Sequence, residues 1–261
     1  MVGVNGEDAP ARDPGDNDII GRAAVRRVRR TPPPGIYGIT SGEFGMGHRE
    51  AARIMLEAGI RIIQYREKSA PARAMADDAR AIRELCASYG ATFIVDDRVD
   101  IAYASGADGV HLGQDDLPID IARRLIGDAI VGASAGTPEE ARRAEEEGAD
   151  YVGAGSVFPT STKGDAHVIG IGGLRAIVGS VHIPVYAIGG IKLEHVRALR
   201  SIGVHGVAVI SAILGSPDPP AAARAFVREW SGSADSRLSP GRHSSRRGAS
   251  RRISDPSWAA P

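Results

Sequence analysis

The sequence has one cysteine, no long apolar run and no net charge, and each of these features excludes a class of protein. Cys86 alone cannot form an internal disulfide framework, so we expect the chain to work in a reducing compartment, the cytoplasm. No apolar run approaches the ~18 residues that a membrane helix needs. A formal net charge of zero gives no bulk attraction to nucleic acid or to anionic lipid. We therefore expect neither a membrane nor a nucleic-acid partner.

The charge that is present is unevenly distributed along the chain. Residues 1–33 and 231–261 together hold 12 Lys+Arg against 7 Asp+Glu, whereas residues 34–230 hold 20 against 25. The first of these tails mixes Gly, Asp, Pro and Arg without periodicity, and the second is rich in Ser, Arg and Gly. Such composition is typical of disorder. We predict a disordered N-terminal tail over 1–33, one catalytic domain over 34–230 and a disordered basic C-terminal tail over 231–261.

Between the tails, short runs rich in Val and Ile alternate with amphipathic stretches eight times. The runs lack regular polar alternation, which is typical of parallel strands covered on both faces. The expected strands are Ile36–Thr40, Ile60–Tyr65, Thr92–Val95, Gly109–Leu112, Ile130–Ala133, Tyr151–Gly155, Pro184–Ile188 and Gly206–Ile210. The expected helices include Arg49–Ala58, Arg73–Ser88, Pro138–Glu147, Leu193–Ser201 and Pro220–Trp230. Eight repeats without a dinucleotide-binding fingerprint favour an α/β fold of the (β/α)8 TIM-barrel type over an open doubly wound sheet.

Polar residues follow the ends of several expected strands. In a barrel of parallel strands every carboxyl end opens onto the same mouth, so these residues should meet there. Gln64, Arg66 and Lys68 are spaced by two and therefore share one face of an extended strand. The two cations could bind a phosphate group. Equally, they could belong to a solvated strand end where Glu67 neutralises their charge.

Two acidic pairs follow the next expected strands. The carboxylates of Asp96-Asp97 and Asp115-Asp116 suit Mg²⁺, although acidic residues after strands also cap helices. His111 stands alone near this position, and a lone histidine at a strand end is more often structural than catalytic. The sequence therefore predicts a phosphate and magnesium site only if these groups meet.

Hydroxyl and glycine residues follow the later strands. The loop 159–164 is rich in hydroxyl groups and ends in a lysine and a glycine, and Gly189-Gly190 and Ile210-Ser211 follow the seventh and eighth strands. Loops of this kind can surround a phosphate with backbone amides, or they can be ordinary tight turns.

Taken together, these motifs resemble those of the thiamine-phosphate synthase family over roughly residues 34–230. The matching segments are 64–68 (QYREK), 97–98 (DR), 111–116 (HLGQDD), 157–163 (VFPTSTK), 189–191 (GGI) and 210–211 (IS). The resemblance implies a Mg²⁺-dependent transferase of thiamine biosynthesis. Such an enzyme joins 4-amino-2-methyl-5-hydroxymethylpyrimidine diphosphate to 4-methyl-5-(2-phosphooxyethyl)thiazole and releases diphosphate.

The resemblance also implies roles for individual residues of this chain. The pyrimidine diphosphate would be bound by Gln64, Tyr65, Arg66, Glu67, Lys68, Asp96, Ser134 and Lys163. The thiazole phosphate would be bound by Thr160, Ser161, Thr162, Gly190, Ile210 and Ser211. Asp97 and Asp116 would bind Mg²⁺, and Arg66, Lys68, Ser134 and Lys163 would be the catalytic residues.

One residue departs from the family pattern, which usually has Asn-Asp-Arg where this chain has Asp96-Asp97-Arg98. An asparagine both donates and accepts hydrogen bonds, whereas an ionised aspartate only accepts, so Asp96 should weaken pyrimidine binding. Two alternatives are a thiazole tautomerase-like barrel, which would leave the cations of segment 64–68 unexplained, and a non-catalytic phosphate-sensing barrel. The sequence leaves open whether the chain forms a homo-oligomer.

Overall fold

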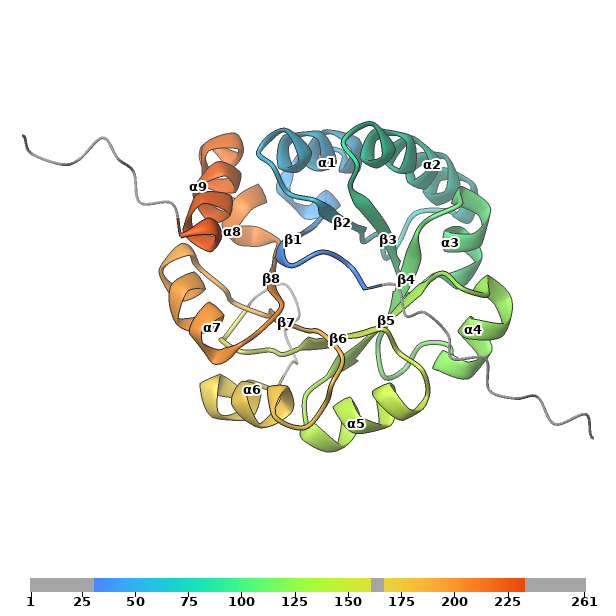
Figure 1. Cartoon of the computed structure of the whole chain (residues 1–261). Coiled ribbons are helices and arrows are strands. Elements are labelled where there is room, and N and C mark those ends of the chain that lie inside the picture. The colour runs from blue at the N-terminus through green and yellow to red at the C-terminus, as the bar shows by residue number, and fades with distance from the viewer. Residues whose placement is uncertain (1–30, 161–166, 233–261) are drawn as a thin grey trace, which may run out of the picture.

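The computed structural model describes residues 31–160 and 167–232. Eight parallel strands follow one another around a closed barrel in chain order, and the eighth pairs with the first. Helices form an outer ring around the strands (Figure 1). This (β/α)8 architecture confirms the predicted fold class, and it brings the carboxyl ends of all eight strands to one face of the barrel.

The strands are short and the helices vary in length. The strands are β1 (Gly35–Ile39), β2 (Ile62–Tyr65), β3 (Thr92–Asp96), β4 (Gly109–Leu112), β5 (Ile130–Ala135), β6 (Tyr151–Ala154), β7 (Val185–Ile188) and β8 (Gly206–Val209). The α-helices are α1 (His48–Glu57), α2 (Ala72–Ser88), α3 (Val99–Ser105), α4 (Ile119–Ile126), α5 (Pro138–Glu146), α6 (Gly170–Val178), α7 (Val196–Ile202), α8 (Ser211–Leu214) and α9 (Pro219–Ser231). Two 3-10 turns, η1 (Gly42–Phe44) and η2 (Leu193–His195), complete the order.

Local sequence signals set several helix ends. Thr137 caps α5, because its hydroxyl accepts a hydrogen bond from the backbone N–H of Glu140 at 3.1 Å and Pro138 occupies the first turn. Asp218 caps α9 in the same way through the N–H of Ala221 at 2.9 Å. These caps fix where two helices start and hence how the following residues return to the barrel.

The hydrophobic core has two layers. The larger layer lies between the strands and the surrounding helices and includes residues such as Met55, Ile82 and Leu174. The smaller layer fills the barrel interior. It consists of Tyr37, Ile39, Ile62, Ile94, Ile130, Tyr151, Tyr186 and Ala208. Three of these interior side chains are tyrosines, so the barrel carries buried hydroxyl groups beneath its mouth.

The chain enters the barrel at the end opposite the mouth. The hydroxyl of Tyr186 donates hydrogen bonds to the carbonyls of Pro32 and Pro33 at 3.1 and 2.8 Å, just before β1 begins. Residues 1–30 and 233–261, which form most of the two predicted tails, lie outside the described residues. Within residues 31–160 and 167–232, no helix is both long enough and apolar enough to cross a membrane.

Candidate active site

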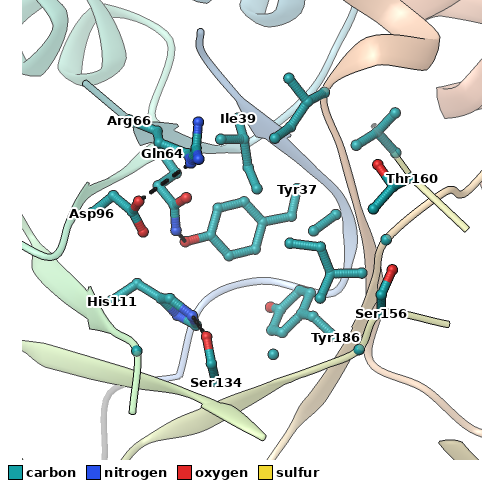
Figure 2. A pocket seen from close by; sticks show the side chains of 18 of the residues that line it. Tyr37, Ile39, Gln64, Arg66, Asp96, His111, Ser134, Ser156, Thr160 and Tyr186 are labelled. Atoms are coloured by element: carbon teal, nitrogen blue, oxygen red, sulfur yellow. Dashed lines mark hydrogen bonds and ion pairs between the residues drawn. The ribbon is translucent and has the colours of Figure 1, made fainter. Parts of the chain in front are cut away.

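A cavity of about 380 Å³ lies at the carboxyl ends of the strands. Residues from all eight strands or from the loops that follow them line it, and Figure 2 shows part of this lining. The predicted site residues among the lining are Gln64, Arg66, Lys68, Asp96, Asp97, Asp116, Ser134, Thr160, Gly190, Ile210 and Ser211. The fold thereby brings together eleven predicted site residues from segments that are far apart in the sequence.

The segment that follows β2 divides its side chains between two faces. Gln64, Arg66 and Lys68 line the cavity, which is the arrangement that their two-residue spacing predicts. Tyr65 and Glu67 face away from it. Tyr65 is buried against the ring of His48, with ring centroids 4.7 Å apart. These two residues were expected to bind the pyrimidine diphosphate, but they lie behind the strand rather than in the cavity.

Glu67 takes part in a buried brace behind the cations. His48 bridges Thr40 and Glu67, with its Nδ1 2.8 Å from the Thr40 hydroxyl and its Nε2 3.0 Å from the Glu67 carboxylate. The Glu67 carboxylate also accepts hydrogen bonds from the N–H groups of Ser69 and Ala70. The bond from the Ser69 N–H, followed by that from His48, lowers the pKa of Glu67 to about 2. The brace therefore fixes the backbone on both sides of Lys68.

Facing the cavity, the two cations pair with the carboxylates that follow β3. The Arg66 guanidinium lies 3.6 Å from Asp96, as Figure 2 shows, and the Lys68 ammonium lies 3.3 Å from the same carboxylate. Lys68 also donates a hydrogen bond to Asp97. Burial raises the pKa of Asp96 to about 6 and the charge of Asp97 adds to the shift, against the opposing effect of Lys68 and Arg66.

Asp97 and Asp116 meet directly, although they follow different strands. The side chains of Asp97 and Asp116 interact, and the Asp116 carboxylate accepts a hydrogen bond from the N–H of Gly113 at 2.6 Å. Burial and the contact with Asp97 raise the pKa of Asp116. Burial alone would also raise the pKa of Asp97, but the interactions of this carboxylate with Lys68 and Asp116 outweigh the effect of burial and lower its pKa. The interaction between the two carboxyl groups therefore shifts their pKa values in opposite directions.

The contact between Asp97 and Asp116 marks a place that could hold a cation. Asp97 adopts a left-handed backbone conformation with φ 56°, which aspartate tolerates better than most residues. Among the described residues, no group of three or more His, Cys, Asp or Glu side chains surrounds a common point. Two carboxylates, completed by water and phosphate oxygens, are nevertheless a donor set that Mg²⁺ accepts. The chemistry of these two residues fits the predicted ion.

The floor of the cavity carries a continuous chain of polar groups. Gln64 Nε2 donates to the Tyr37 hydroxyl at 3.0 Å, and that hydroxyl lies 2.8 Å from the hydroxyl of Tyr151. His111 continues the chain, with Nδ1 3.0 Å from the Tyr151 hydroxyl and Nε2 3.0 Å from the Ser134 hydroxyl. Figure 2 shows the two ends of this chain facing the cavity.

The opposite wall is built mainly from backbone and small residues. Gly189 and Gly190 follow β7 with positive φ angles of 97° and 61°. A Cβ atom at Gly190 would lie 2.8 Å from the Cβ of Phe158, so the two loops can approach only because this residue is a glycine. The Ser156 hydroxyl donates to the carbonyl of Phe158 at 2.7 Å and holds this loop in place. Ser161, Thr162 and Lys163, predicted to continue this wall, lie outside the described residues.

Part of the cavity floor was not predicted from the sequence. Tyr37 and Tyr151 line the cavity, but within short apolar runs they were counted only as strand residues. A usable signal was present, because Gly132 and Gly153 leave room beside the rings of Tyr151 and His111. Gln114 was also missed as an individual residue, and its amide donates to the backbone carbonyl of Ser134 at 2.7 Å.

A comparison with family models agrees with this arrangement. The model described as thiamine monophosphate synthase matches residues 36–213, which span the chain from β1 into α8. The chain belongs to the thiamine monophosphate synthase family. The resemblance found from the motifs is therefore confirmed, over a range that includes every described cavity residue.

Individual members of the thiamine monophosphate synthase family are similar to the chain over most of their length. The thiamine-phosphate synthase of Caldivirga maquilingensis is 52% identical over 199 residues, which cover 76% of this chain and 97% of the relative. That of Pyrococcus horikoshii is 57% identical over 62% of this chain and 79% of the relative. The solved structure of thiamine phosphate pyrophosphorylase from Pyrococcus furiosus is 46% identical with a TM-score of 0.73, covering 76% of this chain and 96% of that one. These similarities support the synthase interpretation over the tautomerase and sensor alternatives.

Proposed function

We propose that the chain is a thiamine-phosphate synthase. It would join 4-amino-2-methyl-5-hydroxymethylpyrimidine diphosphate to 4-methyl-5-(2-phosphooxyethyl)thiazole, yielding thiamine phosphate and diphosphate. The observation that carries the proposal is the meeting of Arg66 and Lys68 with Asp97 and Asp116 in one cavity. Two cations beside a pair of neighbouring carboxylates suit a diphosphate bound together with a divalent ion.

The charged side of the cavity is proposed to bind the pyrimidine diphosphate. Arg66 can grip a phosphate through two parallel hydrogen bonds, while Lys68 contributes a point charge. Ser134 lies partly exposed at the end of the floor and can donate to another phosphate oxygen. Gln64 and Asp96 lie deeper and can meet the polar edge of the aminopyrimidine. Lys163, carried over from the family, would complete the cation set.

Asp97 and Asp116 are proposed to hold Mg²⁺ together with oxygens of the diphosphate. When bound, the ion would supply neutralisation of the negative charge on the leaving group. The role of this chain's own residues is to bring the two carboxylates together, which the Gly113 N–H supports through its bond to Asp116. Lys68, already bonded to Asp97, can move its hydrogen bonds to the phosphate when the ion takes the carboxylate.

The wall built from the loops after β6, β7 and β8 is proposed to bind the thiazole phosphate. Thr160, Gly190 and Ser211 all line the cavity on this side and can present a hydroxyl or backbone N–H groups to an anion. The two substrates would then lie side by side, with the thiazole nitrogen facing the methylene carbon of the pyrimidine.

The chemistry follows from this placement. The C–O bond between the methylene carbon and the diphosphate breaks, and its electron pair leaves with the diphosphate. The electron-rich aminopyrimidine stabilises the positive methylene carbon, and the thiazole nitrogen supplies the pair for the new C–N bond. The residues orient the substrates and neutralise the leaving group, so no side-chain nucleophile is needed.

Product formation from the two substrates, with and without EDTA, tests the proposal. We expect thiamine phosphate and diphosphate in equal amounts, loss of both with EDTA, and recovery on addition of excess Mg²⁺. Conversion of a thiazole substrate alone, insensitive to EDTA, would indicate a tautomerase. Binding of either substrate without turnover under every metal condition would indicate a sensor.

A further inference from the structure

The chain of hydrogen bonds on the cavity floor joins two groups that face the substrate. It runs from Gln64 through Tyr37, Tyr151 and His111 to Ser134, over four bonds of 2.8 to 3.0 Å. All five residues line the cavity, but the first four have exposed fractions of only 0% to 8%, whereas Ser134 is partly exposed. The hydroxyl hydrogens of the two buried tyrosines are therefore expected to find acceptors within the chain.

Counting hydrogens gives the chain a direction. The Gln64 amide nitrogen can only donate, so Tyr37 accepts at that bond. If Tyr37 also accepted from Tyr151, its own hydrogen would point into the buried floor without an acceptor. Tyr37 therefore donates to Tyr151, which in turn donates to Nδ1 of His111. The hydrogen of His111 then resides on Nε2 and is donated to the Ser134 hydroxyl oxygen.

Burial keeps the hydroxyl hydrogens of this chain in place. It raises the pKa values of both Tyr37 and Tyr151 well above the usual range, so both remain protonated wherever the protein is folded. The two tyrosines therefore each contribute one hydroxyl hydrogen throughout the working pH range.

We propose that Tyr37, Tyr151 and His111 are positioning residues that aim the hydroxyl hydrogen of Ser134 into the cavity. Because Ser134 accepts from His111, its own hydrogen is turned toward the ligand, where a diphosphate oxygen can accept it. The reverse tautomer of His111 would take that hydrogen for itself. This inference rests on the proposed function, since it gives Ser134 a negatively charged phosphate oxygen to bind.

Tyr151→Phe tests the proposal in the full-length protein, because it removes one hydroxyl and keeps the ring. We expect kcat/KM for the pyrimidine diphosphate to fall about tenfold, while KM for the thiazole phosphate stays within about twofold. If Tyr151 acts through Ser134, the same substitution in a Ser134→Ala background should change kcat/KM by less than about twofold. Equal losses in both backgrounds would overturn the proposal.

Tyr186→Phe is the matched control. Tyr186 lies in the same interior layer, and its ring packs edge-on against those of Tyr37 and Tyr151 with centroids 5.4 Å apart in both cases. Its hydroxyl points the other way, to the carbonyls of Pro32 and Pro33. We expect this variant to retain the wild-type kinetics for both substrates. Parallel losses in the two tyrosine variants would mean that the floor is only a structural layer and would also overturn the proposal.

A spectroscopic measurement checks the direction of the hydrogen bonds along this chain without relying on turnover. In ¹⁵N-histidine-labelled protein at alkaline pH, the ring nitrogens of His111, assigned by comparison with His111→Asn, should show the Nε2–H tautomer. In Tyr151→Phe the Nδ1–H tautomer should become populated. A wild-type protein with the Nδ1–H tautomer would overturn the inference even if the enzyme is active. A wild-type protein that makes no thiamine phosphate would instead remove the proposed function, and this inference with it.

Discussion

The two sides of the cavity are built on different physical principles. On the side of β2 to β4, Arg66 and Lys68 face three carboxylates, and nearly every contact is between charges. On the side of β6 to β8, the described lining residues are uncharged, and the surface is set by glycines, hydroxyls and backbone. The first side depends on balance among ions, and the second depends on how closely two loops approach.

The two sides of the cavity should respond differently to amino-acid substitution. Removing one member of a buried charge cluster leaves its partners uncompensated, which costs more than the contact itself was worth. Adding an atom to a wall of close-packed backbone displaces the wall and alters its shape. Substitutions on the two sides should therefore affect different substrates and by different amounts, and the following experiments test that division.

The largest effect is expected for Asp97→Ala on the charged side. The substitution removes the carboxylate that meets both Lys68 and Asp116, so kcat/KM should fall about 10²- to 10³-fold. Excess Mg²⁺ should not restore it. The control is Asp120→Ala, an exposed carboxylate on α4, which should behave like the wild type. Steady-state kinetics in which Asp97→Ala turned over normally would remove the proposed metal role.

Gly190→Ala should cause a smaller loss, and this loss should be confined to the binding of the thiazole phosphate. The new Cβ would meet Phe158, and the residue would be strained at φ 61°. We expect KM for the thiazole phosphate to rise about tenfold, with the affinity for the pyrimidine diphosphate changed by less than about twofold. Gly172→Ala is the control, because a Cβ there has open space on helix α6. An equal rise in both KM values would erase the distinction between the two sides.

Asp96→Asn should improve binding by a few fold. The substitution removes a charge that burial already disfavours, as the pKa of about 6 indicates, and it adds a donor for the pyrimidine edge. We expect titration calorimetry to give a Kd for the pyrimidine diphosphate about three- to tenfold lower. Asp100→Asn, an exposed partner of Arg98 outside the cavity, should leave the Kd unchanged. Unchanged or weaker binding in Asp96→Asn would mean that the carboxylate is accommodated in this chain.

An effect on stability, with none expected on substrate binding, is predicted behind the cavity at Glu67. Its folded pKa of about 2 lies below the ordinary value of 4.5, so its contribution to stability is complete above about pH 4.5 and disappears as the pH falls toward 2. Glu67→Gln should lower the free energy of unfolding by about 2 kcal/mol at neutral pH and flatten its decline in acid. Denaturant titrations across pH 2–7 measure this, with the half-exposed Glu50→Gln as control. Parallel pH profiles for the wild type and Glu67→Gln would show that the brace contributes nothing.

Much of the barrel was predictable from sequence because strand spacing and helix caps are local signals. All eight strands lie where the apolar runs predicted them, with shifts of one or two residues at their ends. It was also predictable from a local signal that Arg66 and Lys68 lie on the same face of the strand, because side chains alternate along a strand. The helices α3, α4, α6 and α8, of seven, eight, nine and four residues, were not specified from the sequence.

The remaining features depend on contacts across the barrel, which no local pattern encodes. The pair Tyr37–Tyr151 joins residues 114 positions apart, and His111 lies 40 positions before Tyr151. Taken alone, each of these three residues looks like an ordinary strand residue. Glu67 is the opposite case, because a motif shared with the family placed it among the ligand contacts, whereas its bond to His48 turns its side chain to the rear of the strand.

The bonds from Tyr186 to Pro32 and Pro33 have a practical consequence for handling the molecule. They anchor the start of the described chain at the closed end of the barrel, on the far side from the substrate entrance. A fluorophore or surface linker joined just before residue 31 would thus be attached at the rear of the molecule. Immobilised in that orientation, the protein would present its open end to the solution, and ligand binding could be followed without steric interference from the support.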